Sequence, residues 1–87
     1  MTADDITLEY QDSAVTIRFL GVVHFKFRAK DLISIQAWMN GVDKKIYSIE
    51  YRFKDCATRC EYDVEFKWKK ILELLDRASI FSPEDFE

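Results

Sequence analysis

The sequence predicts an α+β fold, with an antiparallel β-meander of about five strands and one C-terminal helix packed on a face of the sheet. The main observation is that the spacing of the apolar residues changes once, near Asp63. Before Asp63 they occupy alternate positions, which is the period of a strand, and after it they recur every three or four positions, which is the period of a helix. The composition agrees with a folded chain, since 48% of the 87 residues are hydrophobic and only two glycines and one proline occur. We therefore predict a single domain over residues 1–87.

The first predicted strand covers residues 6–10, and the second is unusually long and covers residues 14–28. Apolar side chains keep the same parity in the second strand on both sides of Gly21. Glycine in a strand often marks a bend, because it has no side chain to pack. We interpret this segment as one long strand that bends sharply at Gly21. Two shorter strands in series are the alternative.

The third and fourth predicted strands cover residues 32–39 and 45–54, with the hairpin signal Asn40-Gly41 between them. A two-residue loop would place the apolar face of the fourth strand opposite polar residues of the third, because a one-residue slip turns every side chain to the other face. We therefore predict a loop of three or five residues, or a bulge. A five-residue loop over 40–44 gives these expected pairs: Ala37 with Tyr47, Ile35 with Ile49, and Ile33 with Tyr51. Ile33, Ile35, Ala37 and Met39 then share the core face.

The fifth predicted strand covers residues 59–63, and the helix covers about 64–79, with Asp63 as its N-cap. The apolar residues at helical spacing are Trp68, Ile71, Leu72, Leu75 and Ala78. Three acid-before-base pairs four residues apart support this helix, namely Asp63 with Lys67, Glu65 with Lys69, and Glu73 with Arg77. Residues 80–87 are predicted to be a tail, in which Ser82 and Pro83 resemble a new helix start between Phe81 and Phe86.

No targeting or membrane-spanning segment is predicted. The first ten residues carry three acidic side chains and no basic one, whereas a signal peptide starts with basic residues and an apolar run. No apolar stretch approaches the roughly 20 residues of a membrane span. We therefore expect a cytoplasmic protein without contact to a membrane.

The cysteines do not predict a metal site. Cys56 and Cys60 are separated by three residues, which differs from the two-residue gap of zinc ribbons, and His24 is the only histidine. Two free thiols are expected in a reducing compartment, and a disulfide across a tight loop is the alternative. No cofactor is predicted.

Two sets of polar residues are candidates for catalysis. His24 lies on the predicted outer face, without a carboxylate or nucleophile beside it, so a surface or interface histidine is the simpler interpretation. Glu61 and Asp63 share a strand face, and Glu50 lies mid-strand, so a carboxylate pair is conceivable. Arginines on the same faces favour a ladder of opposite charges instead, and an enzyme is not predicted.

Basic residues are also candidates for nucleic-acid binding, because Lys and Arg neutralise phosphates. The candidates are Arg18, Lys26, Arg28, Lys67, Lys69 and Lys70. RNA-binding sheets expose aromatic rings beside such residues, whereas most aromatic residues here share the parity of the core. A net charge of −3 also disfavours this function.

The predicted function is a small non-enzymatic protein-interaction module that forms a homodimer or binds another protein. One helix cannot cover both faces of the predicted sheet, and the uncovered face carries apolar residues and a tryptophan, which often anchors interfaces. The interface candidates are Leu20, Val22, Trp38, Leu32 and Ile46. The alternative function is binding of a small apolar ligand in a cavity between sheet and helix. The cavity candidates are Phe25, Phe27, Tyr47, Tyr51 and Trp68.

Overall fold

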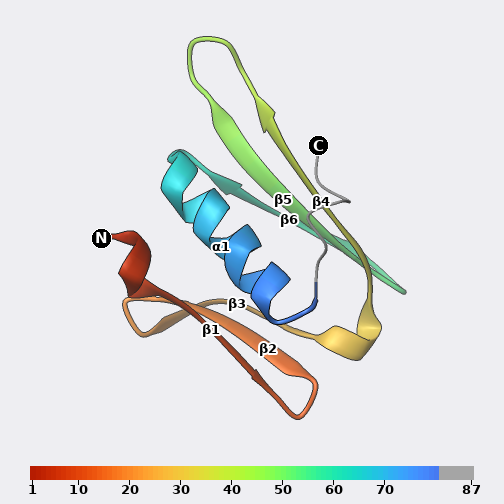
Figure 1. Cartoon of the computed structure of the whole chain (residues 1–87). Helices are drawn as coiled ribbons and strands as arrows, with labels where there is room; N and C mark the ends of the chain where they lie inside the picture. Colours follow the sequence, from red (N-terminus) through yellow and green to blue (C-terminus); the bar gives the residue numbers. More distant parts are fainter. Residues whose placement is uncertain (81–87) are drawn as a thin grey trace.

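The computed structural model describes residues 1–80, which form two three-stranded antiparallel sheets with a helix between them (Figure 1). The first sheet has the strand order β1-β2-β3, and the second has the order β4-β5-β6. The bounds are β1 Ile6–Gln11, β2 Ala14–Phe19, β3 Val22–Arg28, β4 Leu32–Asn40, β5 Ile46–Phe53, β6 Ala57–Tyr62 and α1 Glu65–Arg77. Two short 3-10 helices, η1 over Ala3–Asp5 and η2 over Ala29–Asp31, precede β1 and β4.

The α+β class and the C-terminal helix agree with the sequence prediction, whereas the single sheet of five strands does not. Within residues 1–80 there are six strands, and η2 separates them into two meanders of three. The tail segment over residues 81–87, with the predicted helix start at Ser82 and Pro83, lies outside the described residues.

The predicted long strand over residues 14–28 is wrong, and the alternative of two shorter strands is correct. Leu20 and Gly21 both have positive φ, at 52° and 80°, and form a two-residue hairpin turn that pairs Phe19 with Val22. Such a turn shifts the parity of the core face, but a bulge beside Ile17 shifts it back, so Ile17 pairs with Phe25. The two shifts cancel, which explains why the alternation appears unbroken in the sequence.

The hairpin of β4 and β5 has a five-residue loop, Gly41 to Lys45, so the predicted odd length is confirmed. Its register differs by two residues from the expected one, because Ile35 pairs with Tyr51 and Ala37 with Ile49. A shift of two preserves the faces, and Tyr47, Ile49 and Tyr51 are therefore buried as predicted. Gly41 has a φ of 94°, and a Cβ there would lie 2.0 Å from the carbonyl oxygen of Lys44, so only glycine fits this turn.

A bulge at the start of β4 changes which side chains reach the core. Leu32 pairs with Phe53 and Ser34 with Arg52, so Ile33 has no directly opposite residue. Leu32 packs against the core, whereas Ile33 is 61% exposed. The prediction that Ile33 faces the core and Leu32 the opposite side is therefore wrong. Met39, predicted on the core face, is 44% exposed because it lies near the end of the hairpin.

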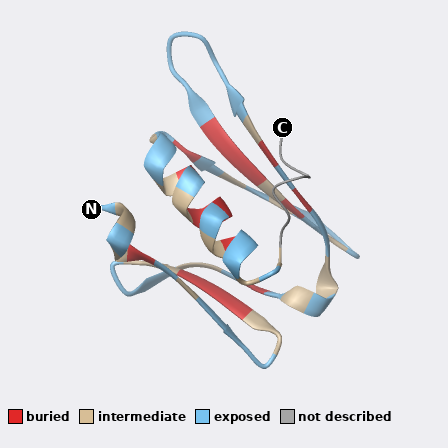
Figure 2. Cartoon of the chain, viewed as in Figure 1, coloured by how far each residue is buried: buried red, intermediate tan, exposed pale blue. Residues whose placement is uncertain are grey.

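The core lies between the sheets and is contributed mainly by the central strands β2 and β5 and by one face of α1 (Figure 2). The buried residues of α1 are Trp68, Ile71, Leu72 and Leu75, as their spacing predicts. The Trp68 indole N–H donates a hydrogen bond of 2.9 Å to the carbonyl oxygen of Ser48, which ties the helix to β5.

The two ends of α1 differ from the prediction by a few residues. Val64, not Asp63, occupies the N-cap position, and it makes no side-chain capping hydrogen bond. The helix ends after Arg77 in a Schellman motif, in which Ser79 has a φ of 59° and the Ile80 N–H bonds to the Leu75 carbonyl.

Candidate functional site

The free edge of β4 is the first component of the candidate site. β4 lies at one side of its sheet and pairs with β5, and no other strand among residues 1–80 pairs with it. Its nine residues, LISIQAWMN, contain no ionisable side chain. The other edge strands each contain charged residues, such as Glu9 in β1, Lys26 in β3 and Arg59 in β6. Charges on an edge strand discourage pairing with another chain, so β4 is the least protected edge of the described fold.

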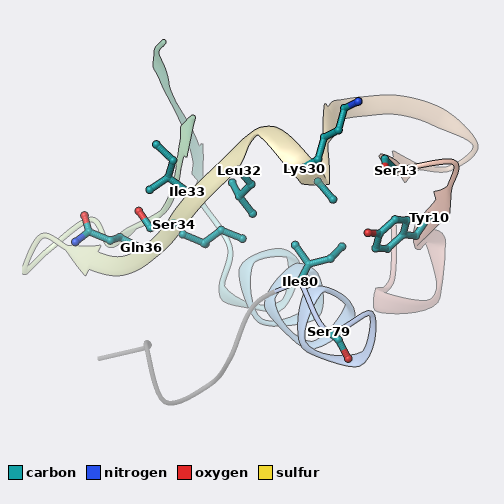
Figure 3. A pocket seen from close by; sticks show the side chains of 11 residues that line it. Tyr10, Ser13, Lys30, Leu32, Ile33, Ser34, Gln36, Ser79 and Ile80 are labelled. Atoms are coloured by element: carbon teal, nitrogen blue, oxygen red, sulfur yellow. The ribbon is translucent and has the colours of Figure 1, made fainter. Parts of the chain in front are cut away.

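A groove of about 600 Å³ runs beside the first half of β4 and is the second component (Figure 3). One wall is β4 from Leu32 to Gln36, and the opposite wall includes Tyr10 and Ser13 from the turn region of β1 and β2. Ile80 lines the groove after the end of α1. In Figure 3, Leu32, Tyr10 and Ile80 point into the groove, whereas Ile33 and Ser34 point away from it. Among residues 1–80, Lys30 is the one Lys, Arg, Asp or Glu residue in this lining, so the described part of the groove is largely uncharged.

An exposed apolar group at the other end of β4 is the third component. The hairpin of β4 and β5 projects beyond the N-terminal end of α1 (Figure 1). It exposes Met39 at 44%, Val42 at 92% and Ile46 at 42%. The same strand edge thus carries a groove at its start and exposed apolar side chains at its end.

Trp38 lies on the outer face of the second sheet, the face opposite to the helix. It is half-buried and pairs with Ser48, and the Arg59 guanidinium lies 5.9 Å from the centre of its ring. Ile46 pairs with Asn40 on the same outer face, two residues further along β4 than Trp38.

The five predicted interface residues do not form one surface. Leu20 and Val22 are exposed together at the turn between β2 and β3, not on the outer face of a long strand. Trp38 and Ile46 share the outer face of the second sheet, and Leu32 packs against the core. Sequence parity could not reveal this separation, since it depends on the turn at Leu20 and the bulge at Ile33.

The five predicted cavity residues lie in or against the core, and their rings contact one another. The ring centres of Phe25 and Tyr51 are 4.5 Å apart, those of Phe27 and Tyr51 are 5.3 Å apart, and those of Tyr47 and Trp68 are 5.2 Å apart. Aromatic side chains therefore fill this part of the core. Phe27 also lines a surface pocket of about 310 Å³ beside Phe53 and Cys56.

His24 belongs to a polar cluster between the two sheets that the sequence did not reveal. Its Nε2 lies 2.6 Å from the hydroxyl of Tyr62, and its ring stacks on Phe19 with centres 4.2 Å apart. Burial, together with the charge of Lys67, lowers the pKa of His24. Burial raises the pKa of Tyr62, so its hydroxyl stays protonated, and the imidazole tautomer determines which of the two groups donates the hydrogen bond. The prediction of an outward-facing histidine without a partner is wrong, because the bulge in β3 turns this side chain inward.

Cys60, beside Tyr62 in this cluster, does not have the properties of a nucleophile. Burial raises the pKa of its thiol, and the thiolate is the reactive form of cysteine. Both Cys60 and Cys56 are free thiols, as expected. The cluster therefore joins the sheets through the hydrogen bond between His24 and Tyr62.

The remaining charged candidates are placed mainly in pairs with opposite charges. Glu50 forms an ion pair of 3.3 Å with Arg52, which agrees with the expected charge ladder. Glu65 pairs with Lys69 at 2.7 Å. Of the predicted helix pairs, Glu73 with Arg77 also forms, but Lys67 lies over the ring of Phe19 instead of pairing with Asp63. Asp63 lies before the first turn of α1.

The basic candidates for nucleic-acid binding are spread over several elements. Arg18 pairs with Glu9 across β1 and β2, and Lys26 and Arg28 follow on β3. Lys70, the last of the six candidates, lies on α1 together with Lys67 and Lys69.

No metal site or membrane helix is found in the part of the chain that the structure describes. No group of three or more His, Cys, Asp or Glu side chains in residues 1–80 could hold a metal ion. Within the same residues, no helix has the length and apolar character needed to cross a membrane. Comparisons with protein-family models, with curated proteins and with solved structures found no match to this chain. The geometry of the β4 edge is therefore the basis of the function proposed for this protein.

Proposed function

We propose that this protein is a non-enzymatic protein-interaction module that self-associates through the free edge of β4. The observation that carries the proposal is the uncharged sequence of this edge, over nine residues, in a chain of which 33% of residues are charged. Unpaired N–H and C=O groups along such a strand can form hydrogen bonds with a strand of another chain. The exposed side chains of Ile33 and Met39 supply apolar area on the same strand.

The polar cluster at His24 supports the non-enzymatic part of the proposal. The thiol of Cys60 and the hydroxyl of Tyr62 both have raised pKa values, so each keeps its proton at neutral pH. The thiolate is the nucleophilic form of cysteine, so the raised pKa of Cys60 disfavours a nucleophilic role. His24 is hydrogen-bonded to Tyr62 and stacks on Phe19, which fits a structural role.

Sedimentation analysis of the wild type and two variants tests this function. Ile33→Lys places a charge on the β4 edge at an exposed position, and we expect it to convert a dimer into a monomer. Ala57→Lys is the matched control, because Ala57 is also exposed on an edge strand, β6. We expect this variant to stay dimeric. A wild-type chain that is monomeric at micromolar concentration, or an equal effect of both substitutions, would overturn the proposal.

A further inference from the structure

The two ends of the β4 edge complement each other, and this defines how a second copy would bind. The groove lies beside Leu32–Gln36, and the exposed Met39 and Val42 lie at and beyond the end of the same strand. In a dimer with two-fold symmetry, if a first patch on one copy contacts a second patch on the other copy, the reverse contact also forms. A strand that carries a groove at one end and apolar side chains at the other satisfies this condition when it pairs antiparallel with itself.

We infer that two copies join their β4 strands antiparallel about Gln36, so that the β4-β5-β6 sheets of the two copies form one sheet of six strands. This inference rests on the proposed function and specifies its partner and geometry. Gln36 is the middle residue of β4, so this register pairs all nine residues, Leu32 to Asn40, with their counterparts. It places Ile33 opposite Met39 of the second copy, and Ser34 opposite Trp38 of the second copy.

The register brings the apolar hairpin of one copy to the groove of the other. Met39 lies on the same sheet face as Ile35 and Ala37, which is the face that borders the groove. Ala37 of the second copy therefore lies next to Ile35 along the wall of the groove, and Met39 of the second copy lies further along, opposite the bulge at Ile33. Burying the exposed side chain of Met39 removes apolar area from water, which favours association.

The charges at the ends of the interface are also compatible with a second copy. Lys30 lines one end of the groove. If the same register is extended beyond β4, Lys30 lies opposite Val42 of the second copy. Asp43, Lys44 and Lys45 follow Val42 in the hairpin loop, so Lys30 of one copy meets charges of both signs in the other. Along β4 itself no like charges oppose each other, because the strand carries none.

Disulfide cross-linking tests the register. In a background with Cys56→Ser and Cys60→Ser, Gln36→Cys places the two introduced thiols directly opposite each other, where Cβ atoms of paired strands are about 4.5–5.5 Å apart. We expect most of the dimer to become covalent on mild oxidation. Ser34→Cys is the matched control, since Ser34 is also exposed on β4. In the proposed register two such cysteines lie four residues apart along the strands, about 13 Å, which is too far for a disulfide.

The outcomes separate this inference from the proposed function. Suppose that Ile33→Lys dissociates the dimer, but that the dimer cross-links through Cys at position 34, or at neither position. This result contradicts the register and leaves the β4 edge as the interface. A wild-type chain that is monomeric in the sedimentation experiment contradicts both. Circular dichroism of each cysteine variant shows whether it retains the native fold before the result is read.

Discussion

At the scale of single residues, two buried tyrosine hydroxyls differ in whether they have a hydrogen-bond partner. The Tyr62 hydroxyl is hydrogen-bonded to His24, whereas the Tyr51 hydroxyl is fully buried and has no hydrogen-bond partner in the described structure. Burial raises the pKa of both, so both stay protonated. An unpaired buried hydroxyl has lost its hydration without compensation, which lowers the stability of the folded state.

Removal of the two hydroxyls should therefore have opposite consequences. We expect Tyr51→Phe to leave the free energy of unfolding unchanged or to raise it by up to about 1 kcal/mol, because an unsatisfied group is removed. We expect Tyr62→Phe to lower it by about 1 kcal/mol, because His24 loses its partner. Urea unfolding of both variants and the wild type measures the difference. If Tyr51→Phe were the more destabilising change, Tyr51 would have a hydrogen bond that this structure does not contain.

At the scale of elements, the turn between β2 and β3 contains a residue that does not suit its backbone. Leu20 has a φ of 52°, a left-handed conformation that costs a residue with a branched apolar side chain about 1–2 kcal/mol, and its side chain is 64% exposed. Asparagine adopts this conformation more readily and is common in two-residue hairpins.

We expect Leu20→Asn to raise the free energy of unfolding by about 1 kcal/mol. Val22→Asn is the control, because Val22 is equally exposed at 69% but lies in a strand next to the turn. We expect the control to be neutral or destabilising, since asparagine disfavours strands. The midpoint of thermal unfolding reports both. A gain of the same size in both variants would mean that the loss of apolar exposure, not the backbone, is responsible.

The same turn shows how far the sequence could predict the elements. The periods of two and 3.6 residues located β1, β4, β5 and β6 and the helix with its buried face, because those signals repeat over many positions. The turn at Leu20 and the bulge beside Ile17 each shift the parity of the apolar residues by one, and their effects cancel. Leu20-Gly21 is also not one of the preferred turn dipeptides, so no local signal separated β2 from β3.

The candidate site was harder to predict than the elements, because it depends on which strands lie at sheet edges. The sequence identified Trp38 and Ile46 as exposed apolar residues, and both lie on one outer sheet face. It could not identify β4 as an edge strand, since this follows from the separation of the two sheets at η2. The absence of charge from Leu32 to Asn40 is the signal in the sequence that could have suggested it.

At the scale of the whole molecule, His24 connects the two sheets, and its titration should affect stability. The groups around it are Phe19 from β2, Tyr62 from β6 and Lys67 from α1. Burial and the Lys67 charge lower the pKa of His24 below its usual value of 6.5. The unfolded chain therefore takes up a proton at a higher pH than the folded chain does. Stability from the neutral imidazole is present above pH 6.5 and is lost as the pH falls toward the folded pKa.

We expect the free energy of unfolding of the wild type to decrease as the pH falls below 6.5. His24→Gln should show a smaller decrease, because its amide can bond to Tyr62 but does not titrate. Urea unfolding of both proteins above and below this pH provides the comparison. Equal pH dependence in the two proteins would show that other groups cause the loss.

The sequential pairing of the strands also has a kinetic consequence. Within each sheet, every strand pairs with the strand before or after it in the chain, so both sheets consist of hairpins that close short loops. Proteins with such local contacts fold faster than those whose distant segments must meet first. α1 contacts both β1 at the start of the chain and β5 in its second half, so its docking is the event with the longest reach along the chain. The assembly of the two meanders around this helix, more than the formation of either sheet, should therefore set the folding rate.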